Sequence, residues 1–246
     1  MKIAVFDSGL GSLSIIKAIQ KKTKCEIVYL ADKKNFPYGK KTKRQLYKII
    51  TETIEKISER FEPDLIVLAS NTPSLLFNGK LPKNVITVLP PLQKIQKARN
   101  VAILATQVVT KSKELDDYIN QFKLDDVTKI NCSELVNLVE NGQFLKNEKQ
   151  CMKTILKVLR DEFKENNIKI ATLSSTHLPF LLPFLKKAFR GVEFLDPAED
   201  VAQKILKIKD TKSIRNSLSI YTTESPKAMQ RNLKNMGISN RVILFS

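Results

Sequence analysis

The fold of this chain is indicated by residues 2–22, which read KIAVFDSGLGSLSIIKAIQKK. Residues 2–7 form a short apolar run that predicts a buried strand, and residues 8–12, rich in Gly and Ser, predict a loop. Residues 13–22 carry apolar side chains at helical spacing, which predicts a helix. A buried strand that leads through a short loop into a helix is typical of an α/β protein.

The same order of strand, loop and helix recurs to the end of the sequence. Thr42 is expected to be the N-cap of a long helix that runs to Phe61 and has an apolar face that includes Leu46 and Ile57. Strands that alternate with helices predict parallel sheets covered by helices on both faces, so the chain is assigned to the α/β class. The remaining strands are expected at 26–31, 64–69, 85–89, 101–105, 127–130, 168–173, 192–195, 218–222 and 241–245.

Two similar lobes are expected, because two segments of the sequence look alike. Residues 68–72 (LASNT) and 173–177 (LSSTH) each follow a predicted buried strand. Each segment places polar side chains at the carboxyl end of a sheet, where open α/β sheets bind their ligands. Pro90 and Pro91 stop a strand and mark a hinge. The predicted lobes are residues 1–91 plus 208–246, and residues 92–207.

The net charge of +17, from 42 Lys and Arg against 25 Asp and Glu, raises the question of nucleic-acid binding. Many of the lysines lie in amphipathic helical stretches such as 146–164, where they are expected to face water. The chain has no Trp, 12 Phe and 5 Tyr, which limits the surfaces on which bases could stack. Nucleic acid is therefore not expected to be the main partner. A positive potential would also attract small dicarboxylates, an effect that salt screens.

Several sequence features that are absent indicate where the protein is located and whether it binds a metal. It has no run of about eighteen apolar residues, so no transmembrane helix is expected. The first predicted strand begins at Lys2, so no signal peptide is expected either. Cys25, Cys132 and Cys151 are odd in number and widely spaced, which suits a reducing cytoplasm and argues against a disulfide framework. A single histidine and scattered carboxylates give no metal-ligand spacing.

Short polar motifs follow most of the predicted strands. They are DSG at 7–9, PYG at 37–39, ASNT at 69–72, LAT at 104–106, VENG at 139–142, LSSTHLP at 173–179 and TT at 222–223. In this order, and over about nine-tenths of the chain, they resemble the motifs of the aspartate/glutamate racemase family. Each motif alone is weak, but their common order makes chance an unsatisfactory explanation.

The resemblance implies a pyridoxal-independent isomerase that acts on glutamate or aspartate in the cytoplasm and supplies a precursor of the peptidoglycan cell wall. In this family the active site lies between two lobes, no cofactor is used, and homodimers are common. Two cysteines, one from each lobe, remove and deliver the α-proton on opposite faces of the substrate. By position these residues are Ser70 and Ser175 here, with Asp7 assisting Ser70 and His177 assisting Ser175.

The resemblance also implies a set of residues that hold the carboxylates and amine of a small dicarboxylic amino acid. By position these are Ser8, Pro37, Tyr38, Gly39, Asn71, Thr72, Thr106, Glu140 and Thr176.

The chain departs from the family pattern at the reacting positions. A cysteine thiol has a pKa of about 8.5, whereas a serine hydroxyl is far less acidic and becomes a base or nucleophile only beside a group that takes its proton. Ser70 and Ser175 therefore put turnover in question while leaving binding intact. Other changes are Ser12, Ala105 and Ser174, where the family usually has glycine, and Val109, where it usually has threonine.

Several alternatives stay open at this point. His177 and Asp7 each have a structural interpretation, as a buried histidine and a helix cap, and the two serines could be ordinary loop residues. The serines are either native or an introduced pair, and the three retained cysteines show only that the chain was not made cysteine-free. The chain as a whole is an active racemase, a catalytically silent relative that binds a dicarboxylate or amino acid, or a different enzyme on the same scaffold. A hydrolase using Ser175 with His177 belongs to the last class.

Overall fold

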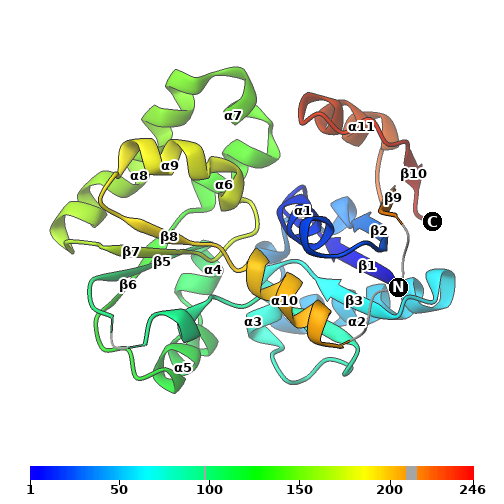
Figure 1. Cartoon of the computed structure of the whole chain (residues 1–246), viewed down its shortest axis with the longest axis horizontal. Coiled ribbons are helices and arrows are strands. Elements are labelled where there is room, and N and C mark those ends of the chain that lie inside the picture. Colours follow the sequence, from blue (N-terminus) through cyan, green and yellow to red (C-terminus); the bar gives the residue numbers. More distant parts are fainter. Residues whose placement is uncertain (97, 209–214) are drawn as a thin grey trace. The chain divides into compact units, whose positions relative to one another are not determined.

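A computed structural model describes residues 1–96, 98–208 and 215–246 of the chain (Figure 1). The chain folds into two compact units: unit 1 comprises Met1–Val88 and Ala198–Ser246, and unit 2 comprises Leu89–Pro197. The first division falls beside the hinge predicted at Pro90. The second falls before residue 198, whereas the predicted boundary lies between residues 207 and 208. Residues 97 and 209–214, which belong to the predicted lobes, lie outside the described residues.

Unit 1 is built on a six-stranded sheet whose neighbouring strands are all parallel. Strand β1 is buried almost throughout, as is typical of a parallel strand covered on both faces. It pairs on one side with β2 and on the other with β3. In order across the sheet, the strands are β10 (Val242–Leu244), β9 (Ser217–Thr222), β2 (Glu26–Ala31), β1 (Lys2–Asp7), β3 (Leu65–Leu68) and β4 (Val85–Thr87).

The long helix of unit 1, α2 (Lys43–Phe61), begins where the sequence predicted it. Thr42 is its N-cap, and a capping box joins Thr42 to Gln45, so the prediction for Thr42 is confirmed. Leu46 and Ile57 lie in a hydrophobic cluster with Phe6 of β1. The other helices of unit 1 are α1 (Ser12–Lys22), the 3₁₀ turns η1 (Lys33–Asn35) and η2 (Tyr38–Lys40), α3 (Asn71–Leu76), α10 (Ala198–Ile208) and α11 (Pro226–Asn235).

Helix α10 explains why the second division falls where it does. It packs along α1, and an ion pair of 3.3 Å joins Lys22 of α1 to Glu199 of α10. Val201 and Ile205 are buried on its inner face. The segment therefore belongs to the core of unit 1, although its amphipathic pattern alone does not reveal which sheet it covers.

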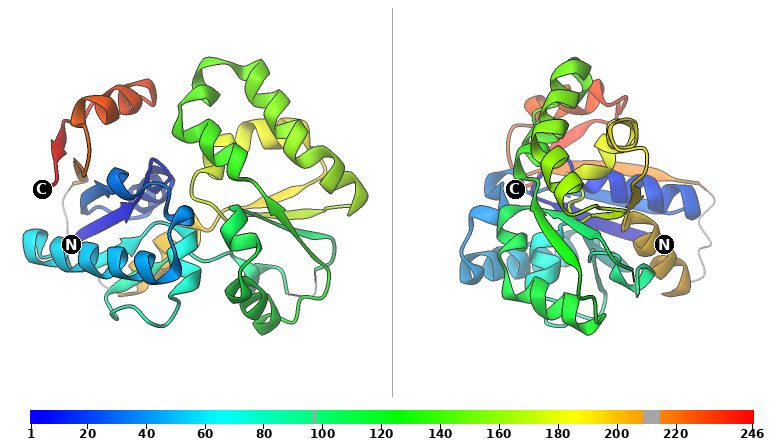
Figure 2. Two further views of the ribbon diagram at one scale, coloured as in Figure 1. Left: turned by 180° about the vertical axis from the view of Figure 1, so that it is seen from behind. Right: turned by 90° about the vertical axis from the view of Figure 1, so that its left-hand side faces the viewer.

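Unit 2 is built on a four-stranded parallel sheet in which β5 lies between β6 and β7. In Figures 1 and 2, helices α8 and α9 lie on one face of this sheet and α5 on the other. The strands in order are β6 (Val127–Asn131), β5 (Val101–Ala105), β7 (Ile170–Leu173) and β8 (Glu193–Leu195). The helices are η3 (Leu92–Lys94), α4 (Gln107–Thr110), α5 (Lys113–Gln121), α6 (Ser133–Glu140), α7 (Gln143–Lys146), α8 (Glu148–Glu165), η4 (Leu178–Leu181) and α9 (Leu182–Ala188).

The α/β class and the two parallel sheets flanked by helices are confirmed. Strand β4 is shorter than predicted: it ends at Thr87, whereas residues 85–89 were expected to form the strand. Within the described residues, no helix combines the length and the apolar character needed to cross a lipid bilayer.

Candidate active site

One group of candidate site residues lies at the carboxyl edge of the sheet of unit 1. Strands β1 and β3 are parallel neighbours, with Phe6 opposite Leu68. Asp7 is the last residue of β1, and Ser70 follows the end of β3 by two residues. The backbone N–H of Ala69 donates to the carbonyl of Phe6 at 2.8 Å, which places the ASNT segment beside Asp7. Asp7 and Ser70 are both buried.

Asp7 and Ser8 are joined by hydrogen bonds. The backbone N–H of Ser8 donates to Asp7 Oδ1 at 2.6 Å, and the Ser8 hydroxyl lies 3.4 Å from the same oxygen. A carboxylate that accepts a backbone N–H is fixed in orientation at the end of its strand. The predicted residues Asp7 and Ser8 therefore form one rigid group.

Ser70 is the N-cap residue of α3, yet its side chain makes no capping hydrogen bond. Its hydroxyl is thus not used in the way that serine usually serves at this position. The neighbouring Asn71 donates from Nδ2 to the carbonyl of Val88 at 3.1 Å, whereas its Oδ1 is buried and has no hydrogen-bond partner among the described residues. Thr72 is buried beside it. An unsatisfied buried carbonyl oxygen is costly unless a ligand N–H completes it.

Tyr38 is held in unit 1 by Asp32, a residue that the sequence analysis did not single out. The Tyr38 hydroxyl donates to Asp32 Oδ2 at 3.0 Å, and Asn35 Nδ2 donates to both carboxylate oxygens at 2.9 and 3.0 Å. The hydroxyl of Thr223, in the TT motif, donates to Asp32 Oδ1 at 3.2 Å. Asp32 therefore anchors the loop that carries Pro37, Tyr38 and Gly39.

The position of Asp32 in the sequence could have indicated that it belongs to the candidate site. It directly follows β2, and its backbone N–H donates to the carbonyl of Asp7 at 2.7 Å. Two carboxylates thus stand at the ends of adjacent parallel strands. Burial raises the pKa of Tyr38 well above its ordinary value, and the charges of Asp32 and Asp7 and the hydrogen bond to Asp32 raise it further.

A second group of candidate site residues lies at the carboxyl edge of the sheet of unit 2. Strands β5 and β7 are parallel neighbours, with Leu104 opposite Leu173. Thr106 follows β5, and Ser175 and Thr176 follow β7. Ser175 and Thr176 are buried, and Thr106 is half-buried. The parallel pairing brings three predicted residues to one edge of the sheet.

His177 and Glu140 form a buried pair in unit 2. The ring nitrogen Nε2 lies 2.8 Å from Glu140 Oε2, and the two side chains are 6% and 5% exposed. The histidine is therefore held by a carboxylate, and its Nδ1 is the other nitrogen of the ring. Among the described residues, no hydrogen bond joins the Ser175 hydroxyl to this ring. A serine–histidine–carboxylate hydrolase requires that bond, so the geometry does not favour one.

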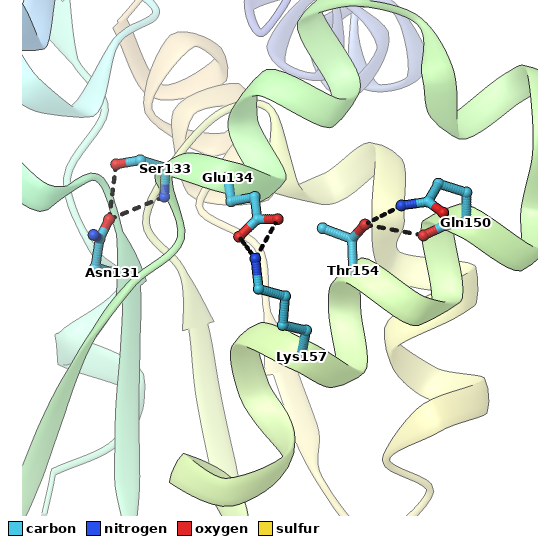
Figure 3. A network of polar contacts seen from close by, with 6 residues as sticks. All are labelled: Asn131, Ser133, Glu134, Gln150, Thr154 and Lys157. Atoms are coloured by element: carbon cyan, nitrogen blue, oxygen red, sulfur yellow. Dashed lines mark hydrogen bonds and ion pairs between the residues drawn. The ribbon is translucent and has the colours of Figure 1, made fainter.

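Thr106 is supported by two residues that the sequence analysis missed. The backbone N–H of Gln107 donates to Ser133 Oγ at 3.0 Å. Ser133 in turn donates from its backbone N–H at 3.0 Å and from its hydroxyl at 2.7 Å to Asn131 Oδ1 (Figure 3). The first turn of α4, which follows Thr106, is thereby fixed to the end of β6.

The four residues that depart from the family pattern, at positions 12, 105, 109 and 174, are all buried. Ser174 and Thr172 share a hydrogen bond of 2.8 Å between their hydroxyls, and Ala105 and Val109 are buried. Ser12 is also buried, and its Oγ has no hydrogen-bond partner among the described residues. Within the described part of the chain, no group of three or more His, Cys, Asp or Glu side chains is placed to hold a metal ion.

Comparison with known proteins identifies the family. No protein-family model matches the chain. A glutamate racemase of Borreliella burgdorferi is 34% identical over 180 residues, which cover 71% of this chain and 67% of that protein. A glutamate racemase of Leptospira borgpetersenii is 29% identical over 231 residues, which cover 89% of this chain and 87% of that protein.

Solved structures agree with these sequence matches. The glutamate racemase of Thermus thermophilus, crystallised with β-chloro-D-alanine, superimposes with a TM-score of 0.85 at 25% identity and covers 100% of this chain and 96% of that one. The fold is thus that of a cofactor-independent amino-acid racemase. The chain belongs to the glutamate racemase family.

The raised pKa of Tyr38 predicts how stability changes in alkaline solution. The unfolded chain releases the tyrosine proton at a pH of about 10, before the folded chain does. The contribution of Tyr38 is therefore fully present below that pH and is lost as pH rises toward its folded pKa. We expect urea unfolding, measured at several pH values in this range, to give a free energy of unfolding that decreases with rising pH. The decrease should be less steep in Tyr38→Phe than in the wild type. Equal slopes for Tyr38→Phe and the wild type would contradict the placement of Tyr38.

The buried pair predicts the tautomer of His177. A neutral ring that meets a carboxylate at Nε2 carries its proton there and leaves Nδ1 as the acceptor. Because the chain has one histidine, nitrogen-15 NMR of histidine-labelled protein reports this ring alone. We expect the Nε2–H form in the wild type and a mixture of tautomers in Glu140→Ala. A wild-type spectrum dominated by the Nδ1–H form would rule out the pair as described.

Proposed function

We propose that this chain is a glutamate racemase that exchanges the α-proton of glutamate without a cofactor. One observation carries the proposal. Each unit has a buried serine at the carboxyl edge of its sheet, and the chain belongs to the glutamate racemase family. These are the positions at which the proton-transferring cysteines of the family are expected. The racemase of Thermus thermophilus, which was crystallised with a small D-amino acid, supports an amino acid as ligand.

In this proposal, unit 1 supplies one proton-transferring group and most of the contacts to the substrate. Ser70 acts on one face of the α-carbon, and the fixed carboxylate of Asp7 takes and returns its proton. The free Oδ1 of Asn71 accepts from the substrate ammonium group. Ser8, Thr72 and the loop of Pro37, Tyr38 and Gly39 hold the carboxylates.

Unit 2 supplies the group for the opposite face. Ser175 delivers or removes the proton there, and His177 relays it. Glu140 stabilises the charged ring of His177 during the transfer. Thr106 and Thr176 donate to the substrate. Removal of the α-proton on one face and delivery of a proton on the other inverts the configuration and leaves atoms and charge in balance.

Serine in place of cysteine makes this chemistry slow. A positioned acid or base typically contributes about 10²–10⁴ to a rate, and this contribution is lost when its pKa is far from the working pH. The alternative function is therefore a catalytically silent protein that binds glutamate or another dicarboxylate. The specific observation in its favour is that Ser175 makes no hydrogen bond to the His177 ring among the described residues.

The same proposal places the protein in the cytoplasm as a homodimer, in the supply of D-glutamate to peptidoglycan. The three cysteines that remain are buried, and burial raises the pKa of Cys25 and of Cys151 to about 11. Neither thiol is suited to replace the missing pair.

The test is α-proton exchange in heavy water, followed by proton NMR with L-glutamate and with D-glutamate as separate substrates. We expect slow loss of the α-proton signal with formation of the other enantiomer. The Ser70→Cys/Ser175→Cys variant should exchange at least about 10²-fold faster, and Ser70→Ala/Ser175→Ala should not exchange. Calorimetry with each enantiomer measures binding independently of turnover.

The outcomes separate the two functions. Binding of glutamate with no exchange by the wild type, and with exchange restored by the two cysteines, would establish the silent binding protein. If the wild type binds glutamate but neither it nor the cysteine variant exchanges the α-proton, proton transfer at these positions would be contradicted. Failure to bind either enantiomer would contradict both functions.

A further inference from the structure

A basic groove runs along the outer face of helix α8 in unit 2. Its volume is about 1110 Å³, and it is lined by residues of α8, by Lys146 and Asn147 just before it, and by Lys187 of α9. Helices α8 and α9 lie side by side in Figures 1 and 2. The groove contains none of the residues assigned to proton transfer or to substrate binding, so the inference goes beyond the proposed function.

The two faces of α8 differ sharply in chemistry. The inner face buries Cys151, Ile155 and Leu159 against the rest of unit 2. On the outer face, Met152 and Leu156 are half-buried and form an apolar floor. The cations of the groove stand around this floor. A long helix that packs one face on a sheet would normally expose only polar side chains on the other.

Most of the cations in the groove are not neutralised. Lys157 pairs with Glu134 at 2.9 Å, as Figure 3 shows, and Lys187 pairs with Glu148 at 3.0 Å. Four other cations of the groove have no ion pair among the described residues; they are Lys146, Lys149, Lys153 and Arg160. The groove therefore offers unpaired positive charge around an apolar strip.

We propose that this groove binds an acidic amphipathic helix of a partner protein. Lys149, Lys153 and Arg160 recur at intervals of one or two turns and span about 17 Å at 1.5 Å per residue. A partner helix of about three turns, with carboxylates at matching intervals and leucine-like residues between them, would pair with these cations and cover Met152 and Leu156. Helices commonly bind to grooves through apolar residues at this spacing, and charge complementarity selects the partner.

Nucleic acid is the competing polyanion, and the groove fits it less well. Its described lining includes no aromatic residue on which a base could stack. The apolar floor would also stay uncovered under a phosphate backbone, because phosphate contacts are made by cations and polar groups. An acidic helix satisfies both the cations and the floor.

The test uses the full chain and a fluorescein-labelled helical peptide of about fifteen residues, with glutamate and leucine at i, i+3 and i+4 spacing on one face. Fluorescence anisotropy measures its binding at low and at physiological salt. The groove variant is Lys146→Glu/Lys149→Glu/Lys153→Glu. The matched control, Lys24→Glu/Lys80→Glu/Lys83→Glu, makes the same change in net charge at exposed positions of unit 1. Lys149 lies in the first turn of α8, where glutamate is favourable, and circular dichroism checks that the groove variant folds.

We expect the wild type and the control variant to bind the peptide, with an affinity that falls as salt rises, and the groove variant to lose at least about tenfold in affinity. Equal losses in the two variants would show attraction to net charge alone and would overturn the proposal. Absence of peptide binding would overturn it as well. So would tighter binding of a thymidine oligonucleotide or of duplex DNA, which would assign the groove to nucleic acid.

Discussion

The structure depends on the parallel pairing of two strands in each unit. Phe6 of β1 lies opposite Leu68 of β3, and Leu104 of β5 lies opposite Leu173 of β7. Parallel neighbours end at the same edge of a sheet, so each pairing brings together polar motifs that are far apart in the sequence. The hydrogen bonds of buried strands hold these motifs more firmly than surface loops could. The pairing of β1 and β3 puts Asp7 beside the ASNT segment, and that of β5 and β7 puts Thr106 beside Ser175 and Thr176.

Around these edges Asp32 and Glu140 are held by hydrogen bonds, whereas the hydroxyls of Ser70 and Ser175 make no hydrogen bond among the described residues. Asp32 is held by three side chains, and Glu140 is held against His177. Ser70, by contrast, stands at an N-cap position without capping, and Asn71 Oδ1 has no partner among the described residues. Rigid networks that surround a few free polar atoms are typical of a binding site for a small polar molecule. The chemistry open to such a site is set by the acidity of the groups at its centre, and here serine makes that acidity low.

Much of this could be predicted from the sequence, because strand burial and helix periodicity are local signals. The N-cap at Thr42 belongs to this kind. The placement of α10 in unit 1 could not be predicted, since an amphipathic helix shows which face it buries and not which sheet it covers. Asp32 matches no motif and could not be singled out in that way, although it directly follows a buried strand and Asp7 ends the neighbouring one. Ser133 and Asn131 act on Thr106 only through the pairing of β5 and β6, a contact that no local pattern reveals.

The central claim is that the two serine-bearing edges serve one glutamate molecule. The most direct measurement is a crystal structure of the chain with D-glutamate bound. The account predicts that the hydroxyls of Ser70 and Ser175 lie on opposite faces of the α-carbon, with Asn71 Oδ1 at the ammonium group. Glutamate held by one unit alone, with the serine of the other unit out of reach of the α-carbon, would contradict it.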